Sequence, residues 1–128
     1  MSNSRTVDAL VSSLGLGRMI AGGAAWAAPE LAWTQFGLAD AAASPEAQVL
    51  GRMFGSRDLV LGAALLLAKR PSTRRQILRA GLVVDGMDLA AALMAKKALS
   101  PKGMASIAGG AASAIAVALL SEATGPNA

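Results

Sequence analysis

The stretch from Leu50 to Leu67 most constrains what this chain can fold into, because it is apolar enough for a membrane helix and yet contains charges. It reads L-G-R-M-F-G-S-R-D-L-V-L-G-A-A-L-L-L, and its charged residues are Arg52, Arg57 and Asp58. A lone charge in the middle of a bilayer costs about 2.5–3.5 kcal/mol even on the more lenient insertion scale. The stretch therefore predicts partners of opposite charge on other helices.

The composition indicates a membrane protein. Of the 128 residues, 54% are hydrophobic and only 16% are charged, whereas charged residues make up about a quarter of ordinary soluble domains. A soluble helical bundle is the alternative, but it needs a polar outer face on every helix. Residues 59–68 contain no polar side chain, so we favour the membrane.

Absent residue types narrow the chemistry. The chain has no Cys, His or Tyr, which excludes disulfides and thiol catalysis and removes the commonest general base and transition-metal ligand. We therefore expect no enzyme, no cofactor and no metal site. The net charge is +4, but the basic residues do not gather with aromatic residues on one face, so we expect no nucleic-acid partner.

Apolar segments and helix-start signals predict four membrane-spanning helices, at about residues 7–28, 45–68, 73–95 and 102–120. Ser44-Pro45 and Ser100-Pro101 combine a capping serine with a proline suited to the first helical position. Thr6 or Ser4 would cap the first helix, and Ser72 or Thr73 the third. The expected fold class is an all-α integral membrane four-helix bundle, forming a single domain over residues 1–128.

Two segments leave alternatives open. The first apolar segment has features of a signal peptide, with Ala25-Trp26-Ala27 as a cleavage site. Arg18 in its middle favours a retained helix. Residues 29–44 contain a tryptophan and other apolar side chains, so a short interfacial helix and a plain loop fit about equally well.

Basic loops predict the orientation. Five or six basic residues would lie on the side of Arg5, most of them between the second and third helices, against three on the other side. By the positive-inside rule we expect a multi-pass protein of the cell membrane with both termini in the cytoplasm. The lipid bilayer is then its first partner, and the basic loop would face anionic headgroups.

Three of the predicted helices place charged residues on the same face as small residues, because the two kinds recur at helical intervals. Small residues mark positions where membrane helices approach closely, so these charges should face neighbouring helices and not lipid. The faces are Gly15, Arg18 and Gly22; Gly51, Gly55, Asp58 and Gly62; and Gly81, Asp85, Asp88 and Ala92.

Three arginines and three aspartates are expected to form a polar core with no net charge. We predict the pairs Arg57–Asp85, Arg52–Asp88 and Arg18–Asp58. The leading hypothesis is an ion-paired core that fixes helix register. The alternatives are arginines that hold a lipid phosphate or quinone oxygen, or an aspartate that carries a proton in transport. A divalent metal at Asp85 and Asp88 is opposed by the nearby arginines.

The motif Gly51-Arg52-x-Phe54-Gly55-x-Arg57-Asp58-x-x-x-Gly62, followed by an arginine-rich loop and Asp85-x-x-Asp88, resembles the domain-of-unknown-function 4267 family. The resemblance covers about residues 10–120. It implies a small four-helix membrane protein, similar in layout to DoxX-like proteins. It implies no activity, and the lack of His, Cys and Tyr argues against carrying over the quinone-coupled chemistry to which DoxX is linked.

The function expected from the sequence is that of a non-enzymatic accessory or structural membrane component, which works with a protein partner or as a homo-oligomer. Exposed small residues on the last helix, such as Gly109, Gly110 and Ser113, would suit such contacts. The alternative is a small transporter, or a protein that binds a lipid-type or quinone-type ligand at the Arg/Asp cluster.

Overall fold

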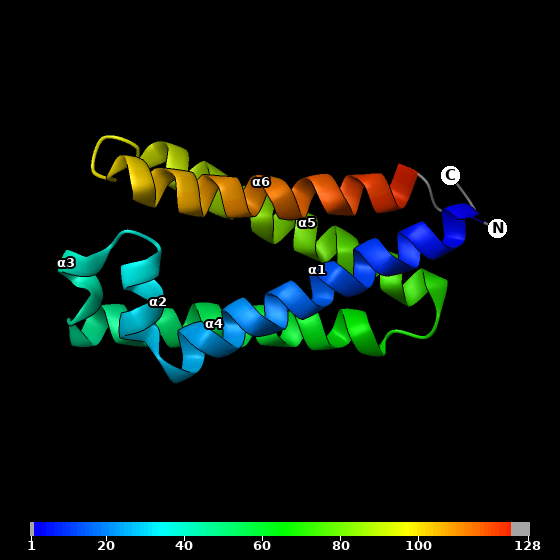
Figure 1. Cartoon of the computed structure of the whole chain (residues 1–128), viewed down its shortest axis with the longest axis horizontal. Helices are drawn as coiled ribbons and strands as arrows, with labels where there is room; N and C mark the ends of the chain where they lie inside the picture. Colours follow the sequence, from blue (N-terminus) through cyan, green and yellow to red (C-terminus); the bar gives the residue numbers. More distant parts are fainter. Residues whose placement is uncertain (1, 124–128) are drawn as a thin grey trace.

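The protein is all-α, and the computed structural model describes residues 2–123. Those residues form six helices and no strand (Figure 1). Four helices are long and two are short. Their bounds are α1 Ser2–Ala27, α2 Pro29–Gln35, α3 Ala39–Ala42, α4 Pro45–Leu67, α5 Pro71–Met94 and α6 Pro101–Ala123.

The long helices associate as two close pairs. α1 runs antiparallel along α4, and α5 runs antiparallel along α6 (Figure 1). The start of α1, the α4–α5 connection and the end of α6 lie at one end of the molecule, and α2 and α3 lie at the other. A small apolar cluster joins all four long helices; it contains Val7, Val11, Leu65, Leu78 and Ala118.

The four predicted segments are all helical, but the prediction of four helices is incomplete. Residues 29–44, for which a short helix and a loop were both open, form two short helices. Pro29 begins α2 because proline suits the first helical position. Gly37 then breaks the helical path with a φ of 81°, a left-handed conformation that glycine adopts without penalty.

Two of the four predicted helix starts are confirmed. Ser44 caps α4 by accepting a hydrogen bond from the Ala47 amide at 3.1 Å, and the Ser100 hydroxyl accepts one from the Gly103 amide at 3.0 Å. The other two are wrong. α5 begins at Pro71 with no side-chain cap, because the residue at the cap position is Arg70, whose side chain has no acceptor atom, and Ser72 and Thr73 lie inside the helix. α1 already begins at Ser2, since no residue before Thr6 breaks a helix.

Reciprocal glycine contacts hold α1 against α4. A Cβ on Gly22 would lie 2.7 Å from the Gly55 carbonyl oxygen, and a Cβ on Gly55 would lie 2.5 Å from the Gly22 oxygen. A Cβ on Gly62 would lie 2.6 Å from the Gly15 oxygen. The two backbones are therefore in contact at Gly22–Gly55 and at Gly15–Gly62. The predicted close-packing faces of these two helices are confirmed.

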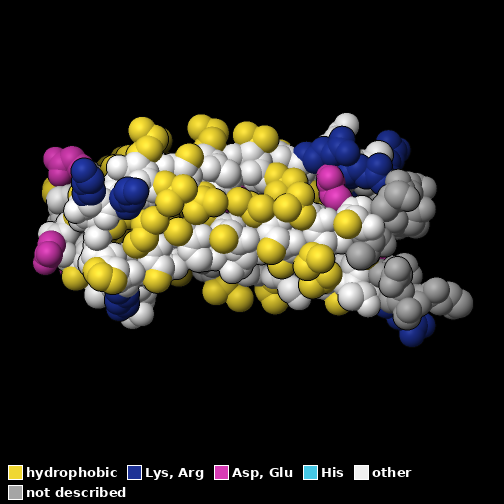
Figure 2. Space-filling view, turned by 90° about the horizontal axis from the view of Figure 1, so that it is seen from above, with side chains coloured by type: hydrophobic (Ala, Val, Ile, Leu, Met, Phe, Trp, Pro, Cys, Tyr) yellow, Lys and Arg dark blue, Asp and Glu magenta, His cyan; other side chains and the backbone are white. Residues whose placement is uncertain are grey.

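The surface of the described residues is rich in exposed large apolar side chains. Ile20, Val60, Met87 and Met94, from three different helices, are 65%, 68%, 67% and 88% exposed. Figure 2 shows apolar side chains along the middle of one face, with charged side chains gathered at its two ends. This pattern is the one expected of a protein whose middle is surrounded by lipid.

By length and composition, one helix within residues 2–123 could cross a membrane, and it is α6, Pro101–Ala123. One such helix is weak evidence for the membrane. The all-α class is therefore established, whereas the membrane four-helix bundle predicted from the sequence is not confirmed. The difference arises because α1, α4 and α5 all carry charges within their apolar sequence.

Candidate functional site

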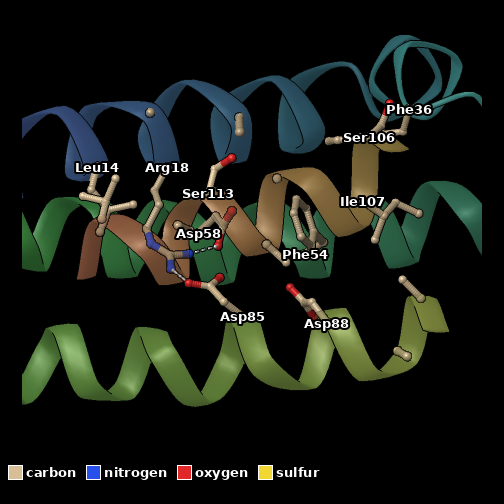
Figure 3. A pocket seen from close by; sticks show the side chains of 18 of the residues that line it. Leu14, Arg18, Phe36, Phe54, Asp58, Asp85, Asp88, Ser106, Ile107 and Ser113 are labelled. Carbon is tan, nitrogen blue, oxygen red and sulfur yellow. Dashed lines mark hydrogen bonds and ion pairs between the residues drawn. The ribbon is translucent and has the colours of Figure 1, made fainter. Parts of the chain in front are cut away.

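Arg18 lies between two aspartates from two other helices (Figure 3). Its Nη1 donates a hydrogen bond to Asp58 Oδ1 at 2.9 Å, and its Nη2 donates one to Asp85 Oδ2. All three residues are buried, with exposed fractions of 8%, 7% and 4%. The Arg18 guanidinium therefore joins α1 to α4 and to α5 through charge-assisted hydrogen bonds.

Glycines make the space for this arrangement. Asp58 lies between Gly55 and Gly62 on α4, opposite Arg18, which lies between Gly15 and Gly22 on α1. On α5, a Cβ at Gly81 would come within 3.2 Å of Arg18 Nη2. The close approach of α1 and α4 thus brings the predicted partners together, and the pair Arg18–Asp58 is confirmed.

A second ion pair lies beside the first. Arg57 Nη1 and Nη2 donate to the two carboxylate oxygens of Asp88 at 3.1 and 2.7 Å, in a two-point contact. The Arg57 guanidinium also lies over the Phe54 ring, 4.7 Å from its centroid, a geometry that supports a cation–π interaction. This pair is less buried than the first, because about a third of each side chain is exposed.

The two ion pairs are linked through Asp58. Arg57 Nε is 3.8 Å from Asp58 Oδ1, which already accepts the bond from Arg18. The Nε itself is buried and has no hydrogen-bond partner within the described part of the chain. The five side chains therefore form one network, although the contact that joins its halves is electrostatic and not a hydrogen bond.

Two predicted pairs are wrong. Arg57 pairs with Asp88 and not with Asp85, because Arg18 from α1 already occupies Asp85. Arg52 does not pair with Asp88. It is exposed and lines a separate hollow beside α2 with Glu30, because Gly51 and Gly55, not Arg52, occupy the face of α4 that packs on its neighbours.

Because Arg52 lies outside the core, the formal charge of the core differs from the predicted value of zero. Two guanidinium groups, of Arg18 and Arg57, face three carboxylates, of Asp58, Asp85 and Asp88, so the cluster has a formal charge of −1 when all are ionised. Among residues 2–123, no other lysine or arginine lies within 4.0 Å of these carboxylates. The neutral core expected from the sequence is thus replaced by one with an unmatched carboxylate.

A cavity of about 610 Å³ adjoins the cluster and is lined by residues of α1, α2, α4, α5 and α6. Most of its wall is apolar, and the polar part includes Arg18 and the three aspartates. Three of the chain's four aromatic residues, Trp33, Phe36 and Phe54, line it as well. Figure 3 shows Phe54 and Asp88 side by side on facing helices, with Arg18 further along.

Aromatic contacts arrange this wall. The Phe36 and Phe54 rings meet edge to face at a centroid distance of 6.4 Å, and the Trp33 and Phe36 centroids are also 6.4 Å apart. The Trp33 indole donates a hydrogen bond to the Ala47 carbonyl at 2.6 Å. This aromatic wall was not predicted from the sequence, which indicated only that Phe54 belongs to the glycine-arginine motif and that residues 29–44 contain apolar side chains.

The site offers ionic and apolar surface, and no arrangement typical of metal binding. Within residues 2–123 there is no group of three or more His, Cys, Asp or Glu residues placed to hold a metal ion. Asp85 and Asp88, the pair considered for a divalent metal, each bind a different arginine. The arrangement is suited to fixing helices against one another and to enclosing an apolar molecule.

Comparison with known proteins identifies the family. The family model described as "Domain of unknown function (DUF4267)" matches residues 15–121. No curated protein and no solved structure matches the chain. The matched residues include α4 and α5 in whole, most of α6 and the second half of α1, together with the whole Arg/Asp cluster. Because they make up more than half of the 128 residues, the chain belongs to the DUF4267 family.

Proposed function

We propose that this protein is a non-enzymatic, multi-pass component of the cell membrane, in which the buried Arg/Asp cluster fixes the register of the helices. The observation that carries the proposal is the exposure of large apolar side chains along the middle of the molecule, with charged side chains at the ends (Figure 2). Soluble monomers rarely expose apolar patches of this extent. Lipid would cover these side chains without cost.

The cluster supports a structural role. Each of its two arginines bonds to carboxylates on neighbouring helices, so the charges are largely matched inside the protein. The contacts are specific in geometry, because a sliding movement of one helix turn would separate Arg18 from both of its partners. A buried polar network of this kind is best attested as a device for register.

The basic end of the molecule supports an orientation. Lys69, Arg70, Arg74 and Arg75 lie at or near the α4–α5 connection, on the same end as the start of α1 (Figure 1). We propose that this end faces the cytoplasm, where basic residues accumulate and where anionic headgroups would attract them.

A protein partner or a second copy of the chain would complete the role. α6 carries an exposed strip of small residues, and a Cβ on Gly109 or Gly110 would meet nothing within 4 Å. Small residues of this kind allow close approach of another membrane helix. The role that we propose is that of an accessory or structural subunit.

Gentle extraction from native membranes, followed by native mass spectrometry, tests this proposal. The expected result is a complex of fixed stoichiometry, with a protein partner or with further copies of the chain, which the variant Gly109→Leu weakens. Gly86→Leu is the matched control, because a Cβ on Gly86 would also meet nothing within 4 Å, and Gly86 lies on α5 and not on the strip of α6. A monomer that travels alone would contradict the accessory role, and recovery without detergent would contradict the membrane setting.

The second candidate function, binding or transport of a ligand at the cluster, is favoured by one observation, the cavity beside it. The form of this candidate expected from the sequence, in which arginines hold a lipid phosphate or a quinone oxygen, is not favoured. The terminal guanidinium nitrogens of both clustered arginines already bond to aspartates, so an anionic group would have to displace them.

A further inference from the structure

We infer that the cavity between the helices is a binding site for a lipophilic monocation, an apolar organic molecule with one positive charge. The inference joins three observations: the unmatched carboxylate of the cluster, the aromatic wall, and the size of the cavity. It goes beyond the proposed function, because a structural role for the ion pairs needs no ligand.

Charge sets the sign of the ligand. With two guanidinium groups against three carboxylates, the fully ionised cluster has a formal charge of −1 in apolar surroundings. An uncompensated charge at such a site is costly, so a positive charge entering the cavity is favoured. An anion would add to the excess and is disfavoured for the same reason.

Asp88 is the carboxylate best placed to meet the ligand. It lines the cavity and its side chain is 28% exposed, whereas those of Asp58 and Asp85 are 9% and 6% exposed. Both of its oxygens accept hydrogen bonds from Arg57, so the unmatched carboxylate is one of the two that share Arg18. The excess negative charge belongs to the cluster as a whole, and Asp88 is the member of the cluster that a ligand in the cavity reaches most easily.

The aromatic wall completes the recognition of a cation. Trp33 and Phe36 line the cavity, and Phe36 meets edge to face the Phe54 ring, which already lies under the Arg57 guanidinium. Aromatic faces attract organic cations through the ring quadrupole, most strongly where water is excluded. The remaining wall consists mainly of Ala, Ile, Leu, Val and Gly from α1, α5 and α6, which suits an apolar body.

The volume fits a ligand of moderate size. Sites for small organic molecules measure about 300–1,000 Å³, and this cavity measures about 610 Å³. A bare metal ion would leave most of it empty. The chemistry of the ligand is therefore that of a lipophilic cation, such as a quaternary ammonium or phosphonium compound.

Tetraphenylphosphonium and tetraphenylborate test the inference, because they have nearly the same size and shape and opposite charge. Binding of each is measured by equilibrium dialysis with the full chain in phosphatidylcholine nanodiscs, and binding to empty nanodiscs is subtracted. We expect saturable one-to-one binding of the phosphonium and none of the borate. Asp88→Asn should weaken phosphonium binding about tenfold or more, because it removes the excess charge at nearly constant volume.

Asp8→Asn is the matched control, since Asp8 is exposed and pairs with Arg74 at the end of the molecule. It should leave the binding unchanged. Gly110→Leu is the second variant if Asp88→Asn fails to fold. It adds a side chain where Gly110 lines the cavity and meets no neighbour within 4 Å, and it should reduce phosphonium binding by filling the space.

Three results would overturn the inference. They are the absence of saturable phosphonium binding, equal binding of the borate, and phosphonium binding that neither Asp88→Asn nor Gly110→Leu weakens. The first would mean that a proton or the surrounding structure balances the cluster. The second would mean that the charge of the cluster does not select the ligand, and the third would place the phosphonium outside this cavity.

Discussion

Replacement of Arg18 by methionine is the most informative change to the cluster. The side chains are similar in length, but the variant leaves the carboxylates of Asp58 and Asp85 buried without their shared guanidinium. Removing one partner of a buried ion pair costs about 3–5 kcal/mol. Since two carboxylates lose their partner, we expect a loss at the upper end of this range, about 5 kcal/mol. Domains of ordinary stability have only about 5–15 kcal/mol to lose.

The triple variant Arg18→Met, Asp58→Leu, Asp85→Leu separates the ion pairs from the geometry of the site. Replacing a whole buried ionic network by apolar side chains is often neutral or stabilising. We therefore expect the triple variant to recover to within about 2 kcal/mol of the natural chain. The single substitution would then be far more harmful than the triple one.

Reversible unfolding in mixed micelles, followed by far-ultraviolet circular dichroism, measures these free energies. Arg52→Met is the matched control, because Arg52 is exposed and lies outside the cluster. Its expected cost is under about 0.5 kcal/mol. The reasoning is refuted if Arg18→Met costs no more than Arg52→Met, or if the triple variant is less stable than the single one.

The remaining predictions concern the second ion pair, the glycine contacts and the surface. Arg57→Met should cost about 1–3 kcal/mol in the same assay, less than Arg18→Met, because Asp88 is partly exposed; an equal cost would contradict the difference in burial. Gly55→Ala should cost about 1–3 kcal/mol, because its Cβ would meet backbone at 2.5 Å. Gly109→Ala, where the space is open, should stabilise the helix by up to about 1 kcal/mol. Changes in stability of the same sign at both positions would contradict the difference in packing. Arg79→Gln should change stability by less than about 1 kcal/mol, since the Arg79–Glu122 pair is exposed, and a larger loss would mean that the outer end of α6 depends on it.

Much of the helical layout could be predicted from the sequence. The Ser-Pro pairs predicted the starts of α4 and α6. In each pair the serine hydroxyl accepts a hydrogen bond from a free amide of the first turn, and the proline, which has no amide hydrogen, fits the first helical position. The spacing of glycine around Arg18 and Asp58 predicted which faces meet, since residues three, four and seven apart share a helix face. The pair Arg18–Asp58 followed directly from it.

Two ion pairs were predicted wrongly, because helical spacing gives the face on which a charge lies but not the rotation of one helix relative to another. Arg52 is only three residues from Gly55, yet it lies at the edge of the packing face and is exposed. Depth along the helices could not distinguish Asp85 from Asp88 as the partner of Arg57, because the choice depends on the position of Arg18 on a third helix.

The aromatic wall and the cavity could not be predicted either. Phe36 lies in the segment whose structure the sequence left open, and Trp33 and Phe54 approach it only once α2 folds back onto α4. The unmatched charge of the core likewise depends on the position of Arg52 outside it, which the spacing within α4 does not give. Both features arise from tertiary packing, which periodicity within single helices does not contain.

If the exposed apolar middle of the molecule faces lipid, single cysteines placed there are shielded from water, and cysteine labelling detects this shielding. The chain has no native cysteine, so single cysteines can be placed at will. Suitable sites are the exposed positions Ile20, Val60, Met87 and Ala112, one on each long helix, with Lys69 and Lys97 as controls at the two ends.

A water-soluble maleimide reacts with the thiolate, which does not form in hydrocarbon. With the protein in permeabilised native membranes, we expect rapid labelling at Lys69→Cys and Lys97→Cys and almost none at the four middle positions. After denaturation, all six variants should label equally. Rapid labelling of the middle positions in the folded protein would rule out a membrane setting for this surface, because it would show that water and not lipid surrounds them.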